Sequence, residues 1–122
     1  MTIGEALARV DRIKPNQFTR EDKIFWLSEI EGRIHEEIND ADGEKKPFEG
    51  YSVNIGDETE LRVEYPYDAL YVQWLKWNIE NVQGEQMYAN NTYSLFEEIL
   101  GSYKKWYMRR NRRHLPRVRI LR

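Results

Sequence analysis

The chain contains no cysteine among its 122 residues, which rules out disulfides, thiol catalysis and cysteine zinc sites. No apolar run approaches the length of a membrane-spanning helix, and the mean hydropathy is −0.84. The first residues, MTIGEALARVDR, carry charges where a signal peptide has an apolar stretch. We therefore expect a cytoplasmic protein with no membrane partner. With 40% apolar and 33% charged residues, a chain of this length is expected to form a single domain.

The signatures of common enzymes are also missing. The sequence has no nucleophile elbow, no Walker glycine loop and no dinucleotide-binding fingerprint. Its two histidines, His35 and His114, lie on different predicted elements, and we expect both at the solvated surface. Asp40, Asp42 and Glu44 resemble the start of a calcium loop, but the third acid and the distal glutamate of that motif are missing, so a turn is expected. We predict no enzymatic activity, no metal and no cofactor.

The stretch from Pro66 to Gly84, PYDALYVQWLKWNIENVQG, is the one around which the rest of the chain is organised. Asp68 can cap a helix that runs to about Val82, and Gly84 can end it. Its polar residues form only a narrow stripe: Gln73, Lys76, Glu80 and Gln83. A helix that is apolar around the rest of its circumference must be surrounded by protein, so we predict that it is the central helix of the fold.

Three further helices are predicted around it. Thr2 and Glu5 form a capping-box pattern ahead of a short amphipathic helix that ends by Lys14. Thr19, with Asp22 three residues on, starts a second helix that ends near residue 39. The apolar face of this second helix comprises Ile24, Leu27, Ile30, Ile34 and Ile38. A fourth helix, from about residue 85 to 110, should pack antiparallel on the central helix because the connection between them is short.

Between the second and the central helix, apolar and polar residues alternate twice. Tyr51, Val53 and Ile55 come before a turn that contains glycine, and the alternation resumes from Leu61 to Tyr65. This pattern predicts a β-hairpin near residues 51–65. The expected fold class is therefore mainly α: a single helical domain over residues 1–108, a bundle of three to four helices with one inserted β-hairpin, followed by a basic arm at 109–122.

The charge is distributed unevenly along the chain. Residues 104–122 contain nine lysines or arginines and no acid, whereas residues 1–103 contain ten bases and all twenty-one acids. The arginines of the arm are the candidate binding residues: Arg109, Arg110, Arg112, Arg113, Arg117, Arg119 and Arg122. An acidic body with a basic tail predicts an acidic partner for that tail.

Three interpretations of the tail remain open at this point. It could be a solvated arm without a binding role. It could bind nucleic acid, because Lys104 and Lys105 and the arginines interleave with Trp106 and Tyr107, although the acidic body would repel phosphates. It could also join the body of a neighbouring copy, and such heterologous contacts close into rings when the rotation between copies allows.

Four segments together resemble a family of small proteins encoded in the structural modules of tailed bacteriophages and of prophages of Gram-positive bacteria. They are TIGEALARVDRIKPNQF, KIFWLSEIEGRIHEEI, TELRVEYPYDALYVQWLKWNIENVQGEQMYANNTYSLFEEI and WYMRRNR, and they cover nearly the whole chain. Members of this family are head–tail connector, or head-completion, proteins. The resemblance rests on an overall pattern and not on a catalytic signature.

The resemblance implies a structural virion protein that forms an oligomeric ring between the portal and the tail. The implied partners are further copies of the chain, the phage portal protein, a downstream tail-completion protein and DNA that passes through the channel without sequence specificity. The implied location is the host cytoplasm during assembly and then the virion neck. By position along the chain, Arg109 to Arg122 would grip the portal or a neighbouring subunit, and residues 40–64 would face the lumen or a neighbour. The alternative function is a small nucleic-acid-binding protein that uses the same arm.

Overall fold

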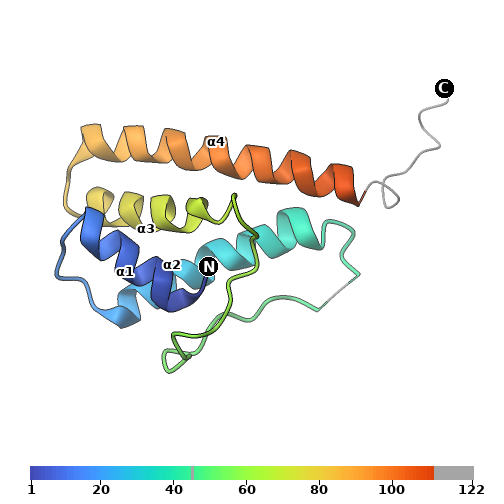
Figure 1. The fold of residues 1–122 in the computed structure, drawn as a ribbon, viewed down its shortest axis with the longest axis horizontal. Coiled ribbons are helices and arrows are strands. Elements are labelled where there is room, and N and C mark those ends of the chain that lie inside the picture. Colours follow the sequence, from blue (N-terminus) through green and yellow to red (C-terminus); the bar gives the residue numbers. More distant parts are fainter. Residues whose placement is uncertain (45, 112–122) are drawn as a thin grey trace.

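The structure is a computed structural model, and it describes residues 1–44 and 46–111. The described residues form four α-helices: α1 (Ile3–Ile13), α2 (Arg20–Ile34), α3 (Ala69–Val82) and α4 (Gln86–Arg110) (Figure 1). A π-helical turn, η1 (His35–Asn39), continues α2. A long irregular loop joins η1 to α3. The prediction of a mainly α fold is confirmed, and none of the helices in the described part of the chain is long and apolar enough to cross a membrane.

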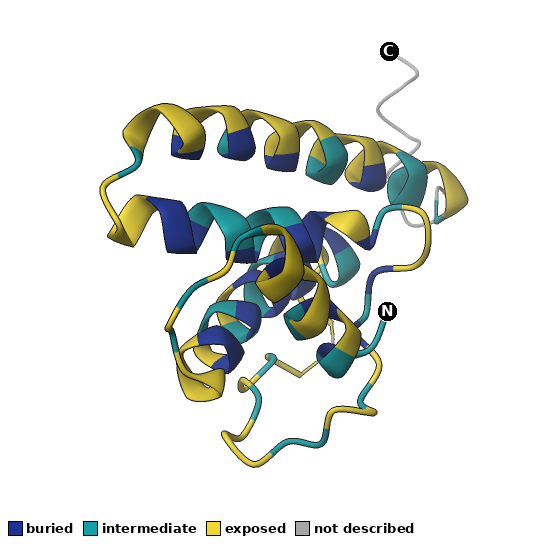
Figure 2. Ribbon diagram, turned by 60° about the vertical axis from the view of Figure 1, so that its left-hand side comes forward, coloured by how far each residue is buried: buried dark blue, intermediate teal, exposed yellow. Residues whose placement is uncertain are grey.

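The predicted central helix does occupy the middle of the fold. α3 packs against α4 on one side and against α1 and α2 on the other, so the molecule has three layers (Figures 1 and 2). Leu70, Tyr71, Leu75 and Ile79 are fully buried along α3. The indole of Trp74 also donates a hydrogen bond of 2.7 Å to the carbonyl of Trp26, which fastens α3 to α2. Burial on two sides explains why α3 is apolar around most of its circumference.

The ends of α3 differ in how well the sequence predicted them. Gly84 adopts a φ of +78° just after the helix, a conformation that glycine reaches without a Cβ clash, as expected for a helix stop. Asp68 stands at the N-cap position, but its side chain makes no capping hydrogen bond. The Asp68 carboxylate instead accepts a hydrogen bond of 3.2 Å from the amino group of Met1.

The first two helices begin as the sequence predicts. Thr2 and Glu5 form a reciprocal capping box at α1, and Thr19 and Asp22 form one at α2. Each box satisfies two backbone N–H groups that would otherwise lack a partner. The predicted apolar face of α2 and η1 is buried throughout. The π-helical turn ends this segment at Asn39, where the sequence placed its end.

The prediction of a β-hairpin near residues 51–65 is wrong. Among the described residues there is no β-strand, and the one isolated antiparallel bridge joins Thr2 to Glu60. Leu61 and Val63 are buried as the alternation suggests, but Val53 is 50% exposed and Tyr65 is 86% exposed. The two halves of the expected hairpin therefore do not share an apolar face.

The physical reason is that the backbone of this loop finds partners outside it. The amide of Tyr51 donates to Ser28 Oγ at 2.8 Å, and the amide of Arg62 donates to the Glu31 carboxylate at 3.1 Å. Residues 57–61 run beside the start of α1, where the amide of Gly4 donates to the carbonyl of Asp57 at 2.9 Å. Gly4 permits this approach, because a Cβ at that position would lie 2.8 Å from the Asp57 Cβ. These contacts satisfy backbone groups that strand pairing would otherwise satisfy.

The contact between α3 and α4 gives a direct test of the fold. The Phe96 side chain is fully buried and its ring lies 5.1 Å from that of Trp74, whereas the adjacent Leu95 is 44% exposed. We expect Phe96→Ala to lower the free energy of unfolding by about 3 to 5 kcal/mol, because it leaves a cavity in the core. The matched control Leu95→Ala should cost less than about 1 kcal/mol. Urea denaturation followed by circular dichroism measures both, and equal costs would contradict the packing described here.

Candidate functional site

The carboxyl end of α4 carries the described part of the predicted basic site. Lys104, Lys105, Arg109 and Arg110 are exposed there, and the guanidinium of Arg110 lies 4.9 Å from the ring centre of Trp106. The other predicted binding residues lie outside the described residues: Arg112, Arg113, Arg117, Arg119 and Arg122. α4 runs through Arg110, so the first two arginines of the arm stand on its last turn.

The aromatic residues between these bases face the body of the protein. The hydroxyl of Tyr103 accepts a hydrogen bond of 3.0 Å from the side chain of Asn39, and the Tyr107 hydroxyl donates to the Asn39 carbonyl at 3.3 Å. The ring of Trp106 lies 5.5 Å from that of Tyr67. Burial raises the pKa of Tyr103 to about 12, against the opposing effect of the Asn39 hydrogen bond. The root of the basic arm is thus fixed to η1 and to the loop.

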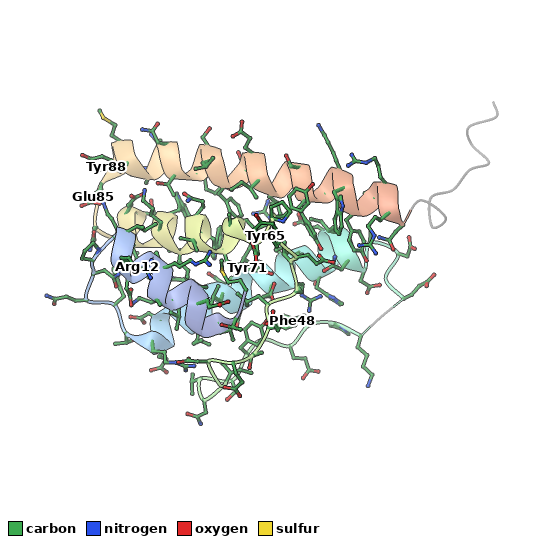
Figure 3. All side chains as sticks on the ribbon, viewed as in Figure 1. Arg12, Phe48, Tyr65, Tyr71, Glu85 and Tyr88 are labelled. Atoms are coloured by element: carbon green, nitrogen blue, oxygen red, sulfur yellow. The ribbon has the colours of Figure 1, made fainter. Side chains whose placement is uncertain are left out.

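A fully buried carboxylate, that of Glu31, is held on α2. One oxygen of Glu31 accepts hydrogen bonds from the Tyr51 hydroxyl at 2.5 Å and the Arg62 amide at 3.1 Å. The other oxygen accepts from the Tyr71 hydroxyl at 2.5 Å, and the Tyr71 oxygen in turn accepts from the amide of Val63 at 3.0 Å. Burial and the negative charge of Glu31 raise the pKa of both tyrosines well above the ordinary value. The network, of which Figure 3 labels Tyr71, ties the loop to α2 and α3.

The same network extends to His35, which the sequence analysis wrongly placed at the solvated surface. His35 is only 7% exposed. Its Nε2 lies 2.7 Å from the Lys46 carbonyl and its Nδ1 lies 3.3 Å from the guanidinium of Arg62. Arg62 also donates to the side chain of Asn39 at 3.3 Å. His35 therefore helps to hold the start of the loop, and His114 lies outside the described residues.

A second buried carboxylate, that of Glu80, connects the helices at the other end of the bundle. Glu80, predicted to lie on a polar stripe, is fully buried and accepts a hydrogen bond of 2.7 Å from Thr92 on α4. The ammonium groups of Lys76 and Lys14 lie 2.8 and 3.5 Å from it, and Lys14 also pairs with Glu85 at 2.7 Å. Burial raises the pKa of Glu80, but hydrogen bonds from Lys76 and Thr92 outweigh that effect and lower it. The cluster connects α1, α3 and α4.

Sequence reasoning missed both carboxylates as interior residues. For Glu31 a signal was present: it follows Leu27 by four residues and precedes Ile34 by three, so it stands within the apolar stripe of α2. Such a position predicts a buried charge that needs partners. For Glu80 the signal was its place in a helix expected to be surrounded by protein. The partners themselves come from distant parts of the chain and cannot be read from local spacing.

Seven of the sixteen exposed acids in the described part of the chain lie in the loop that these networks hold. Residues 40–68 contain nine acids and three bases. Seven of these acids are exposed: Asp42, Glu44, Glu49, Asp57, Glu58, Glu60 and Glu64. Figures 1 and 2 show residues 47–60 on the side of the body away from α4. The described structure thus separates an acidic face, on the loop, from a basic end, on α4.

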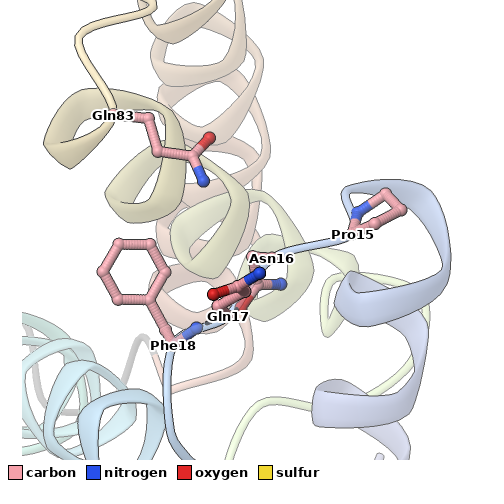
Figure 4. Close-up of a pocket in the computed structure, with 5 residues that line it drawn as sticks. All are labelled: Pro15, Asn16, Gln17, Phe18 and Gln83. Atoms are coloured by element: carbon pink, nitrogen blue, oxygen red, sulfur yellow. Dashed lines mark hydrogen bonds between the residues drawn. The ribbon is translucent and has the colours of Figure 1, made fainter.

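The hollows of the surface are shallow and open. One, of about 590 Å³, lies between the connection from α1 to α2 and the end of α3 (Figure 4). Its lining consists of Pro15, Asn16, Gln17, Phe18 and Gln83, none of which titrates. Within residues 1–44 and 46–111, no group of three or more His, Cys, Asp or Glu side chains is placed to hold a metal ion.

Comparisons of the chain with protein-family models, with curated proteins and with solved structures found no match. The site therefore has to be interpreted from its own geometry. That geometry consists of a basic end, an acidic face and two buried polar networks that hold them in place.

The Glu31 network predicts an alkaline loss of stability. Tyr51 and Tyr71 have raised pKa values in the folded protein. As pH rises above about 10, the unfolded chain loses these protons and the folded one keeps them, so the free energy of unfolding falls by about 1.4 kcal/mol per pH unit for each tyrosine. Tyr71→Phe should cost about 2 kcal/mol at pH 7, where the hydrogen bonds to Glu31 and Val63 are lost, yet show a shallower decline above pH 10.

Urea denaturation between pH 7 and 11 measures this effect. The control is Tyr65→Phe, whose side chain is 86% exposed and which should follow the parent curve. A Tyr71→Phe curve parallel to that of the parent above pH 10 would show that this hydroxyl is not held in its neutral form by the buried carboxylate.

Proposed function

We propose that this protein is a structural component of the neck of a tailed phage, a head–tail connector that assembles into a ring between portal and tail. The sequence resemblance suggests the class, and the separation of charge supports it. Residues 47–60 of the acidic loop lie on the side of the body away from α4, whose carboxyl end carries the bases, and surfaces of opposite sign on different sides join copies head to tail. This separation is the observation that carries the proposal.

The roles of the parts follow from the charges. The arginines from Arg109 to Arg122 hold the ring together or hold it to the portal protein, and the acidic loop faces the channel or a neighbour. An acidic lining would repel DNA weakly and let it slide without sequence specificity. A downstream tail-completion protein would meet the opposite end of the ring. Assembly takes place in the host cytoplasm, and the finished ring belongs to the virion neck.

Nucleic-acid binding through the arm is the alternative, and the packing around α4 weighs against it. Stacking on bases needs exposed aromatic faces next to the basic residues. Here Tyr103 is buried, Tyr107 bonds to Asn39 and Trp106 packs beside Tyr67. The aromatic residues of the described basic segment are therefore committed to the fold.

The experiment is co-purification of the full chain with the portal protein of the phage that encodes it, together with electron microscopy of the complex. We expect rings with a central channel. Replacement of the five arginines outside the described residues by glutamine should lower the amount recovered with the portal at least tenfold, because each charged contact is lost at physiological ionic strength. The control is Arg9→Gln with Arg12→Gln on the exposed side of α1, outside the basic site, which should bind as the parent does.

Circular dichroism of each variant verifies that the helices are intact. Full recovery of the five-arginine variant with the portal would contradict the assignment of the arm. A parent protein that forms no ring and does not bind the portal, but shifts a short DNA duplex at physiological salt, would replace the connector with the nucleic-acid-binding alternative.

A further inference from the structure

An apolar groove runs along the outer side of α2, between that helix and the loop. Phe25 is 62% exposed and Val53 is 50% exposed, although both are large apolar side chains. They line a hollow of about 470 Å³ that also contacts Trp26 and Tyr51. A second hollow of about 330 Å³ continues it past Phe25 toward Phe48. Exposed apolar side chains that gather in a hollow can receive the apolar side chains of another chain.

The rim of the groove is acidic. Glu21, Glu29, Glu36 and Glu49 line these two hollows. Glu58 lines a third hollow, of about 740 Å³, that also contacts Val53, and all five glutamates are exposed. The lining also contains two arginines, and both are paired. Arg20 bonds to Asp57 at 2.7 Å and Arg33 to Glu37 at 3.4 Å. A ligand for this surface needs apolar side chains for the floor and positive charge for the rim.

The last residues of the chain have this composition. Residues 117–122 read Arg-Val-Arg-Ile-Leu-Arg, directly after Pro116. In an extended segment alternate side chains point to opposite sides, so Val118 and Ile120 can enter the groove while Arg117 and Arg119 reach its rim. Six extended residues span about 20 Å. The stretch of helix from Glu21 to Glu36 is about 22 Å long, so the lengths agree.

We propose that residues 112–122 of one copy bind in the groove between α2 and the loop of a neighbouring copy. The contact deepens the ring proposed above and rests on it. The arm leaves the body at the end of α4, whereas the part of the loop that borders the groove lies on the side away from α4 (Figures 1 and 2). Donor and acceptor on different sides of one molecule connect copies in series, and a series closes into a ring when the rotation between copies allows it.

The absence of cysteine makes a cross-linking test simple. Two single-cysteine proteins, Ile120→Cys and Val53→Cys, are mixed and treated with a short flexible bis-maleimide. Only a contact between copies can join them. The matched control replaces Val53→Cys with Leu95→Cys, a similarly exposed apolar position on α4. We expect at least fivefold more heterodimer with Val53→Cys, and a yield that falls with salt.

Charge-reversal variants test whether the acidic rim of the groove binds the arm. Glu29→Lys with Glu49→Lys should reduce the Val53→Cys yield to the control level. Glu97→Lys with Glu98→Lys makes the same charge change on exposed α4 positions and should leave the yield unaltered. Introducing Arg117→Glu and Arg119→Glu into the Ile120→Cys protein should restore part of the cross-link yield lost with Glu29→Lys and Glu49→Lys, because the interacting charges are exchanged.

The outcomes separate this contact from the proposed function. Equal yields at positions 53 and 95, or no heterodimer at all, would overturn the groove contact, and rings that still bind the portal would show that the connector proposal survives. A double-cysteine chain that closes on itself without joining another copy would place the arm in its own groove and overturn the neighbour assignment. If the five-arginine variant loses portal binding and the Ile120→Cys and Val53→Cys proteins form no cross-link, the arm binds the portal and the groove contact is overturned.

Discussion

The buried carboxylate of Glu31 is the constraint on which the arrangement of the loop depends. The Glu31 carboxylate is fully buried, and burying a carboxylate costs free energy unless hydrogen bonds replace those that it makes to water. Its donors come from two separate parts of the loop, Tyr51 and the Arg62 amide, and from Tyr71 on α3. Packing α2 against α3 without the loop in place would leave the charge short of partners. The loop and the helical core therefore form one cooperative unit, even though the described loop has no strand.

This constraint gives the acidic face a defined shape. A loop of mostly polar residues without strands would ordinarily be mobile. Here one end is held by His35 and Arg62, and residues 57–61 are held by the start of α1. Asn39, which accepts a hydrogen bond from the same Arg62, fixes Tyr103 and Tyr107 and so fixes the root of the basic arm. The two surfaces that the proposed assembly uses are thus both supported by buried polar contacts.

The helices could be predicted from the sequence because their signals are local. Capping boxes, the apolar periodicity of α2 and the glycine after α3 each act within a few residues. The loop could not be predicted this way. Tyr51 and Val63 alternate with polar neighbours as strand residues do, but their hydrogen-bond partners are side chains more than seven positions away. Period-two alternation detects a half-buried extended segment and does not reveal what that segment pairs with.

The most direct measurement of the central claim, that a buried carboxylate orders the loop, is amide hydrogen exchange at single-residue resolution. The amides of Arg62 and Val63 bond to Glu31 and to the Tyr71 hydroxyl, and they should exchange about as slowly as the core of α3. The amide of Asn54, bonded to Ser52 in the exposed part of the loop, should exchange fast. Exchange at Arg62 and Val63 as fast as at Asn54 would contradict the account, because the loop would then open independently of the helices.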